Sequence, residues 1–356
     1  MQDSTHGLQT LVGGAMYQSH WRRHIRGRTV LALAVAATLA ACSTQGSAAE
    51  GQSKPSVQEQ AEQQAQKSSA AGTAAADPAD SIDWKTVAQA MGRSGAMQPG
   101  GVYKFSMPRS DLHVTVNGVL IKPALSLGSW LAMKPKGSKQ VVAMGDLVLT
   151  QDEVHSVMTK LQDAGIMQTA LHNHLLHESP RVMYMHIDGE GDPIRIAQGV
   201  RAALALTKTP AAASGGSQPA APLRLDTAQI RQVLGHDGKV NGGVYQVSIP
   251  RPETIRASGI EVPPAMGTAT SINFEPTGGG RAAINGDFVM TAGEVNRVIR
   301  ALTENGIEVV AVHNHMLTEE PRLFFLHYWA NDDAVKLARG LRRALDQLQV
   351  RPGAPR

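Results

Sequence analysis

The sequence contains one cysteine, Cys42, in 356 residues. An intramolecular disulfide is therefore excluded, and the burial of a core or the binding of a metal must stabilise the fold. The sequence also lacks a long apolar run, because the run near the N-terminus, residues 30–41, has only twelve residues. A mature membrane-spanning helix needs about 20 residues, so this run is too short to be one.

The charge of the chain gives little reason to expect a nucleic-acid partner. Aromatic residues make up only 4% of the sequence, and no basic stripe with interleaved aromatic residues is present. The formal net charge is +4, but residues 1–42 contribute four arginines and one aspartate, which leaves +1 for the rest of the chain. Since binding to phosphates needs concentrated positive charge, we expect no nucleic acid among the partners.

Residues 1–42 are predicted to be a signal peptide that ends in a lipidation site. Arginines precede the short apolar run, and the run ends in Leu39-Ala40-Ala41-Cys42. This order is typical of export signals, and the last four residues resemble the lipobox of bacterial lipoproteins, in which the cysteine is lipidated. We therefore expect a cell-envelope protein, anchored to a membrane by a lipid on Cys42 and facing the periplasm or the exterior. Residues 43–80, rich in Gln, Ala, Ser and Glu, are predicted to be a disordered tether.

One pattern of residues occurs twice, 141 residues apart. The strings His172-Asn-His174 and His313-Asn-His315 are each followed by a glutamate, by Pro-Arg and by a third histidine. Because a duplication keeps special residues in register only where both copies need them, the shared histidines and glutamates are candidate functional residues. The sequence predicts two homologous domains, at residues 81–208 and 225–349. A linker at residues 209–224 joins them, and a tail follows at residues 350–356.

Each domain is expected to be α+β, with a mostly antiparallel sheet and a few packed helices. Thr150 and Glu153 are spaced as a capping box, and Thr291 and Glu294 repeat it, so a helix should begin at each. Helices are also expected at residues 83–91 and 193–206, and strands at 101–107, 112–121, 140–149, 166–175 and 182–187.

The predicted strands bring three histidines of each domain together. Alternate residues of a strand point to the same face, so His172 and His174 should project side by side, about 7 Å apart at their Cα atoms. His186 lies on the next predicted strand, where it can join them. The second domain offers the same set: His313, His315 and His327.

Three histidines with one open coordination position are the catalytic form of a zinc site. We therefore predict a divalent metal in one or both domains, with zinc favoured and manganese, iron and nickel left open. Glu178 and Glu319 are candidates for a fourth ligand or for a proton shuttle acting on bound water. Arg181 and Arg322 are candidates for binding a substrate carboxylate, although an arginine near a glutamate in a turn can equally form a structural ion pair.

Two further pairs of residues recur in the duplication. Arg109 and Arg251 each follow a proline at the end of a predicted strand. Each could bind a substrate carboxylate or form a structural ion pair. Asp146 and Asp287 each follow a glycine and precede an apolar stretch. Since Gly-Asp is typical of a turn, we expect these aspartates to form turns.

The longest motifs of the chain resemble the LppY/LpqO family of bacterial lipoproteins. These motifs are Met144-Gly-Asp-Leu-Val-Leu-Thr-Gln-Asp-Glu-Val154, Ala170-Leu-His-Asn-His-Leu-Leu176, and the Glu178-Ser-Pro-Arg181 and Met185-His186 that follow. The second copy matches through Ile284-Asn-Gly-Asp287 and Val312-His-Asn-His315, and the likeness covers nearly all of residues 81–349. The resemblance implies an exported, lipid-anchored protein and brings no assigned activity.

Two shorter likenesses concern mechanism. His-x-His followed about a dozen residues later by another histidine, in a tandem duplication, is similar to α-acetolactate decarboxylase. That resemblance implies zinc held by His313, His315 and His327, or by the first-domain set, and an arginine that orients a keto acid. The surrounding sequence differs, and decarboxylases of that type are not lipoproteins. His-x-His with a glutamate four residues later also matches the cupin metal motif, but a cupin is nearly all-β, whereas here a capped helix precedes the strand.

Two functions are consistent with these observations. In the first, the protein is a metal-dependent enzyme of the decarboxylase, hydrolase or lyase type that acts on a small carbonyl or carboxylate compound. In the second, it is a non-enzymatic envelope protein that binds metal or a partner. An open cleft with a free coordination position favours the enzyme, whereas a buried and fully occupied site favours a structural role. Histidines that point apart would exclude a shared metal.

Overall fold

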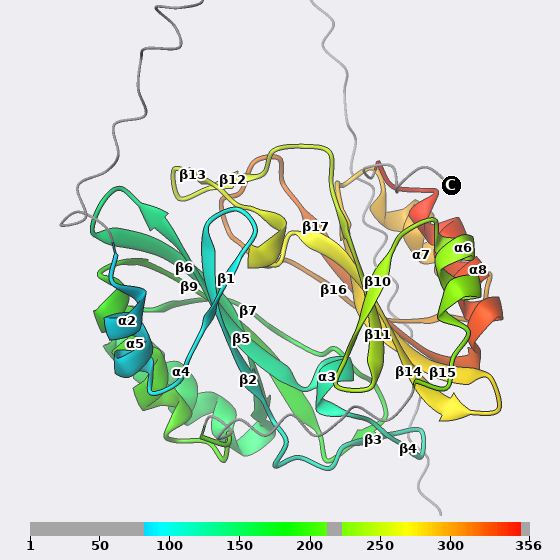
Figure 1. Cartoon of the computed structure of the whole chain (residues 1–356), viewed down its shortest axis with the longest axis horizontal. Helices are drawn as coiled ribbons and strands as arrows, with labels where there is room; N and C mark the ends of the chain where they lie inside the picture. The colour runs from blue at the N-terminus through cyan, green and yellow to red at the C-terminus, as the bar shows by residue number, and fades with distance from the viewer. Residues whose placement is uncertain (1–81, 212–222, 350–356) are drawn as a thin grey trace, which may run out of the picture. The chain divides into compact units, whose positions relative to one another are not determined.

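The chain forms two similar α+β repeats, each with a six-stranded antiparallel sheet that carries helices on one face (Figure 1). The computed structural model describes residues 82–211 and 223–349. The predicted signal peptide with Cys42, the tether, the middle of the linker and the tail lie outside these residues. The predicted α+β fold with an internal duplication is confirmed.

The first sheet has the strand order β1-β2-β5-β6-β9-β7. Its strands are β1 (Ala96–Gln98), β2 (Val102–Pro108), β5 (Gly128–Lys136), β6 (Gln140–Thr150), β9 (Val182–Gly191) and β7 (Met167–His172). Three helices accompany it: α2 (Trp84–Met91), α4 (Val154–Asp163), which follows the 3-10 turn η2 (Gln151–Glu153), and α5 (Pro193–Leu204).

The second sheet repeats this plan in the order β10-β11-β14-β15-β17-β16. Its strands are β10 (Gly238–Asn241), β11 (Val244–Pro250), β14 (Ala269–Gly278), β15 (Arg281–Met290), β17 (Phe324–Asp333) and β16 (Glu308–His313). Its helices are α6 (Thr227–Leu234), α7 (Val295–Thr303) and α8 (Ala334–Leu345). The remaining short elements are β3 (Thr115–Val116), β4 (Val119–Leu120), β8 (Glu178–Ser179), β12 (Arg256–Ala257), β13 (Ile260–Glu261), α3 (Pro123–Ser126) and η3 (Pro264–Met266).

Local sequence explains where the helices begin. The Asp83 carboxylate accepts from the Lys85 amide at the start of α2, and the Asp192 carboxylate accepts from the Ile194 amide at the start of α5. The predicted capping box is confirmed, since Glu153 Oε2 accepts from the Thr150 amide at 2.8 Å. Among the described helices, none has the length and apolarity to cross a membrane.

The segment between residues 110 and 140 differs from the prediction. A single strand was expected at 112–121, but Asn117 and Gly118 have positive φ values of 48° and 81° and divide it into the hairpin β3–β4. The strand β5, a central member of the first sheet, was not predicted. Its ends carry Gly128, Pro135 and Lys136, which interrupt the apolar pattern on which strand prediction depends.

The molecule has four layers, with helices outside and the two sheets facing each other inside (Figure 1). Between each sheet and its helices lies a core that belongs to one repeat, such as the packing of Phe105 and Leu131 with Val200. Between the two sheets lie two further cores that contain residues of both repeats. Burial of one large apolar side chain contributes about 1.5–3 kcal/mol, so these shared cores hold the sheets face to face.

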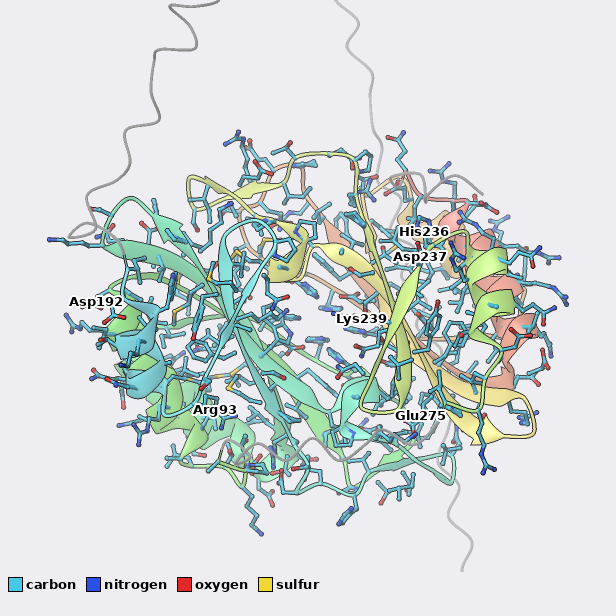
Figure 2. All side chains as sticks on the ribbon, in the orientation of Figure 1. Arg93, Asp192, His236, Asp237, Lys239 and Glu275 are labelled. Atoms are coloured by element: carbon cyan, nitrogen blue, oxygen red, sulfur yellow. The ribbon has the colours of Figure 1, made fainter. Side chains whose placement is uncertain are left out.

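Polar contacts also join the repeats. Glu275 of β14, labelled in Figure 2, accepts a hydrogen bond from the Lys122 amide of the first repeat at 2.9 Å. The Lys104 ammonium donates to the Ala265 carbonyl at 2.9 Å, and the equivalent Gln246 amide donates to the Ala124 carbonyl at 2.9 Å. The last two contacts are reciprocal, so the repeats face each other with approximate two-fold symmetry.

Candidate metal centre

Equivalent strands of the two sheets position the histidines. His172 is the last residue of β7, and His186 lies in the middle of the neighbouring β9, opposite Ala170 of β7. In the second repeat, His313 ends β16 and His327 lies on β17, opposite Ala311. Two members of the set, His174 and His315, follow the strands instead of lying within them as predicted.

All six histidines meet in one cluster between the sheets, whereas the sequence predicted a separate trio in each domain. The rings of His172 and His313 stack with centroids 3.8 Å apart. On either side of this pair, a ring of one repeat lies against a ring of the other. These flanking pairs are His174 with His327, at 3.7 Å, and His186 with His315, at 3.9 Å.

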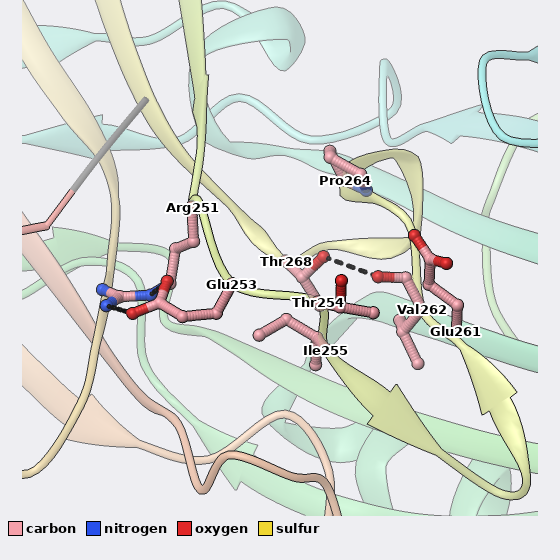
Figure 3. Close-up of a pocket in the computed structure, with 8 residues that line it drawn as sticks. All are labelled: Arg251, Glu253, Thr254, Ile255, Glu261, Val262, Pro264 and Thr268. Atoms are coloured by element: carbon pink, nitrogen blue, oxygen red, sulfur yellow. Dashed lines mark hydrogen bonds and ion pairs between the residues drawn. The ribbon is translucent and has the colours of Figure 1, made fainter. Parts of the chain in front are cut away.

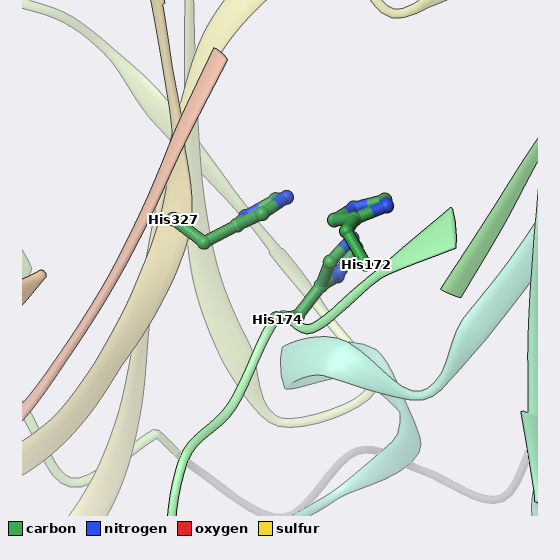
Figure 4. Close-up of side chains that lie close together, drawn as sticks. All are labelled: His172, His174 and His327. Carbon is green, nitrogen blue, oxygen red and sulfur yellow. The ribbon is translucent and has the colours of Figure 1, made fainter. Parts of the chain in front are cut away.

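Three groups of histidines have donor atoms close enough to share a metal ion, with all donors within 4.8 Å of one another. One group lies within the second repeat, and the other two combine residues of both repeats. The groups are His172, His174 and His327 (Figure 4), then His172, His186 and His313, and then His313, His315 and His327. Of the two predicted trios, only His313, His315 and His327 form such a group, and His172, His174 and His186 do not, because the other two groups join the repeats.

Backbone carbonyls orient three of the rings. His186 Nδ1 lies 3.3 Å from the Gly145 carbonyl, His327 Nδ1 lies 2.7 Å from the Gly286 carbonyl, and His315 Nδ1 lies 3.1 Å from the Gly267 carbonyl. A carbonyl accepts only, so each Nδ1 carries the proton and each Nε2 keeps its lone pair free. This arrangement is common for metal-binding histidines.

Burial keeps the cluster neutral. Desolvation lowers the pKa of all six histidines, and the positive charge that neighbouring histidines would carry lowers it further for most of them. The pKa falls to about 3 for His186 and to about 4 for His315. Neutral imidazole is the form that binds metal, so the site is ready to accept an ion at neutral pH.

Asp146 and Asp287 belong to the centre, and the prediction that they form turns was wrong. They lie inside the long strands β6 and β15, directly opposite His186 and His327. Asp146 Oδ2 is 3.3 Å from His174 Nε2, and the equivalent distance from Asp287 to the Nε2 of His315 is 3.1 Å.

Close packing, and not a turn, explains the glycine before each of these aspartates. A Cβ at Gly286 would lie 2.0 Å from the Ser271 carbonyl oxygen, and one at Gly145 would lie 2.7 Å from the Trp130 carbonyl oxygen. The recurrence of Gly-Asp in both copies was the feature that could have identified the aspartates from sequence.

The four predicted catalytic residues lie in the segments that follow the histidine strings, with Glu178 in the short strand β8. Arg181 Nε is 3.3 Å from Glu178 Oε1, and Arg322 Nη1 is 3.1 Å from Glu319 Oε1. Glu319 also accepts from the Leu323 amide at 2.9 Å. Neither glutamate is in a metal-competent group of the described residues, and both arginines occupy ion pairs. Their roles in catalysis stay predictions.

One difference between the repeats lies directly beside the histidines. Tyr184 stacks on His174 with centroids 3.5 Å apart, and in the second repeat Phe325 stacks on His315 at 3.4 Å. The Tyr184 hydroxyl is buried without a hydrogen-bond partner among the described residues, and so is Glu178 Oε2. Burial raises the pKa of Tyr184 well above its usual range, as do the nearby Asp146 and Glu178. The tyrosine is therefore a neutral hydrogen-bond donor that only the first repeat provides.

Arg109 and Arg251 are structural. Arg251 is buried, and its guanidinium pairs with Glu294 and Glu253 at 2.8 Å and donates to the Val289 carbonyl. Arg109 forms the equivalent bonds in the first repeat, with Asp111, Glu153 and the Val148 carbonyl. Each arginine fixes a strand end to the start of a helix, so neither is free to bind a substrate.

A small hollow lies beside Arg251 and is distinct from the histidine cluster (Figure 3). Its volume is about 30 Å³, and its lining includes Glu253, Glu261 and Thr268. A space of this size holds a water molecule but no organic substrate. A larger hollow, of about 390 Å³, lies beside α7 and is lined by Arg297, Arg300 and Glu304 among others. Neither hollow is lined by a histidine of the cluster.

Together, the fold and the cluster define a two-repeat α+β protein with a buried, histidine-rich centre that could hold metal. A family model described as "Domain of Unknown Function (DUF1259)" matches residues 85–206 and again residues 228–347. The chain belongs to this family, with one copy of the domain in each repeat. No curated protein matches the chain.

Two solved structures are distantly similar to the chain. A trimeric bacterial microcompartment shell protein, PduB, is 14% identical over 73% of this chain and 98% of its own, with a TM-score of 0.17. EtuB from Clostridium kluyveri is 10% identical over 74% of this chain and 96% of its own, with a TM-score of 0.18. Scores this low support no conclusion about the present chain.

Proposed function

We propose that the protein binds divalent metal, with zinc favoured, in the histidine cluster between its repeats. One observation carries the proposal: eight ring nitrogens of the six histidines are buried without a hydrogen-bond partner among the described residues. Each unsatisfied buried polar atom costs about 1–3 kcal/mol, so eight of them would consume most of the stability of a domain. A bound metal would take up the one free lone pair of a neutral ring as a ligand, so it would give some of these nitrogens a partner.

The donor set favours zinc and similar transition-metal ions over magnesium and calcium. Neutral imidazole nitrogens dominate the site, and one carboxylate oxygen each of Asp146 and Asp287 lies 3.3 and 3.1 Å from the Nε2 of His174 and His315. Sites rich in imidazole suit zinc, copper, iron and nickel, whereas magnesium and calcium prefer oxygen ligands. Manganese, iron and nickel stay open as alternatives.

We expect elemental analysis of the full chain, purified in detergent without a histidine tag, to find bound transition metal. The variant His172→Ala/His313→Ala removes the central stacked pair and should lose most of the metal. A matched control is His155→Ala, because His155 lies on α4, outside every metal-competent group of the described residues. Less than about 0.2 equivalents of metal in the wild type, even after reloading, would exclude the proposal.

We further propose that the chain is a lipoprotein of the LppY/LpqO type, exported and anchored to a membrane by a lipid on Cys42. The order of arginines, short apolar run and Leu-Ala-Ala-Cys supports this proposal. In a bacterial host, the wild-type chain should incorporate labelled fatty acid and partition into detergent. Cys42→Ala should abolish both properties, and a wild type that remains unlabelled and in the aqueous phase would contradict the anchor.

Metal-dependent catalysis on a small carbonyl or carboxylate compound is the second candidate function. The unpartnered Tyr184 hydroxyl beside His174 favours it, because a neutral donor next to a metal can bind an oxygen of a substrate. The metal would act as a Lewis acid, with Glu178 or Glu319 as proton shuttle. Acetate or pyruvate added to cobalt-loaded protein should change its visible spectrum, and Tyr184→Phe should weaken the change. An unaltered spectrum at saturating metal would favour the non-enzymatic alternative.

A further inference from the structure

We infer that the chain holds one divalent ion, and that His313, His315 and His327 of the second repeat are its protein ligands. The inference rests on the proposed metal-binding function. It deepens that function by assigning the number of ions and by choosing one of the three metal-competent groups. In this arrangement the first repeat positions the site and supplies no ligand.

The three metal-competent groups of the described residues overlap, so they cannot all be filled. His172, His313 and His327 each belong to two of the groups, and any two groups have one of these histidines in common. A neutral imidazole carries one ring proton and has one free lone pair, so it binds one ion. An ion in one group therefore takes a ligand from each of the other two groups, and the cluster holds one ion at a time.

Ring orientation distinguishes the three groups. A ligand histidine usually donates its other ring N–H to a carbonyl or a carboxylate, and the loss of such a partner lowers metal affinity about 10- to 100-fold. Carbonyls orient His327 at 2.7 Å, His315 at 3.1 Å and His186 at 3.3 Å. Among the described residues, the group of His313, His315 and His327 therefore contains two oriented rings, whereas each of the other groups contains one.

The first repeat also holds the backbone beside one of the proposed ligands. The Thr169 hydroxyl on β7 donates to the His315 carbonyl at 2.6 Å, and the Asn314 side chain donates to the Thr169 carbonyl at 2.9 Å. The His174 carbonyl accepts one bond of 2.8 Å from the other repeat, donated by Asn285. Within the described chain, two bonds between the repeats thus fix the segment that carries His315, and one fixes the segment that carries His174.

The two repeats are not equivalent as metal sites. His172, His174 and His186 occupy the positions in the first repeat that correspond to the proposed ligands, but they do not form a metal-competent group. The trio of the second repeat is therefore the one that comes together within a single repeat of the described chain. Three protein ligands leave the fourth position of a tetrahedral ion open, which is the arrangement of catalytic zinc sites.

The number of ions bound per chain tests the first part of the inference. The full chain, purified in detergent without a histidine tag, is stripped with a chelator, reloaded with zinc, desalted and analysed for metal. We expect about one equivalent per chain. Two equivalents would overturn the inference while leaving metal binding intact, and no metal would overturn the proposed function itself.

Three single variants test the choice of group, because His174, His186 and His315 each belong to one group only, a different group in each case. In a zinc titration, we expect His315→Ala to lower the affinity about 10- to 100-fold, since the ion must then use a group with one fewer oriented ring. His174→Ala and His186→Ala leave the proposed group complete, so each should lower the affinity much less. An equal or larger effect of either variant would overturn the assignment.

Circular dichroism establishes that each variant is folded before its affinity is compared. If His315→Ala does not fold, His315→Gln takes its place, because glutamine keeps a polar side chain of similar size. The same loss of zinc affinity is expected for His315→Gln. An affinity equal to that of the wild type would overturn the assignment of His315 as a ligand.

Discussion

We expect chelation of the proposed metal to lower the unfolding temperature of the protein by about 8–16 °C for each ion removed. A ligand present at about 1,000 times its dissociation constant stabilises the folded state by about 4 kcal/mol. In a protein of this size, each kcal/mol shifts the midpoint by about 2–4 °C. The loss is large because the chelated protein retains eight buried ring nitrogens without partners. Thermal unfolding followed by circular dichroism, with and without chelator at pH 7.5, measures it.

The metal-free protein should lose further stability in acid. Burial lowers the pKa of His315 to about 4 and of His186 to about 3, so the folded state keeps both neutral. The unfolded chain takes up protons on these histidines below about pH 6.5. Because the unfolded state then binds more protons, the free energy of unfolding falls as pH falls, by up to about 1.4 kcal/mol per pH unit for each histidine. The loss begins near pH 6.5 and ends near pH 4 for His315 and near pH 3 for His186.

The control for the chelator effect is His172→Ala/His313→Ala, in which chelator should have little influence on the unfolding temperature. A wild type that unfolds at the same temperature with and without chelator would show that the cluster does not depend on metal. If the stability of the chelated wild type did not change between pH 7.5 and pH 5, the histidines would be accessible to protons in the folded state.

Replacing Arg251 with methionine destabilises the protein by about 3–5 kcal/mol. The substitution keeps most of the side-chain volume but leaves Glu294 buried without its cation and the Val289 carbonyl without its donor. Breaking a buried ion pair on one side is costly because the remaining charge stays desolvated. Urea unfolding at pH 7.5 measures the change.

An exposed ion pair provides the comparison for Arg251→Met. Arg281 pairs with Asp332 on the surface, with the arginine side chain 49% exposed, so Arg281→Met should cost less than about 1 kcal/mol. The folded Arg251→Met variant should still bind the same amount of metal, because the arginine contacts no ligand. Equal effects of the two substitutions, or loss of metal from the folded Arg251 variant, would contradict its structural assignment.

The fold was predictable where local sequence determines structure. Capping residues such as Thr150 and Asp192 placed helices correctly, because a cap acts on amides only two or three residues away. The strands before His172 and His313 were also predictable from their apolar composition. The hairpin β3–β4 was missed because its turn, Asn117-Gly118, was counted as part of one strand. The strand β5 was missed because residues unfavourable for a strand lie at its ends.

The candidate site was predictable in its residues but not in its arrangement. The repeated histidines identified the ligands, whereas the pairing of His174 with His327 depends on how two sheets pack, which no local pattern encodes. Asp146 was assigned to a turn because Gly-Asp is common there. Here the glycine is required by the close approach of Trp130 on the neighbouring strand, a contact between residues distant in sequence.

The mixing of histidines from both repeats has a consequence for the history of the chain. A single copy of the domain contains only part of each mixed ligand group, so a lone ancestor could complete such a group only by pairing with a second copy across a two-fold axis. Fusion of two copies in one chain makes the association of the two domains intramolecular. The short connection then gives each domain a high effective concentration near the other. Two fused halves are free to diverge, and the difference between Tyr184 and Phe325 beside equivalent histidines is an asymmetry that a symmetric dimer of identical chains cannot have.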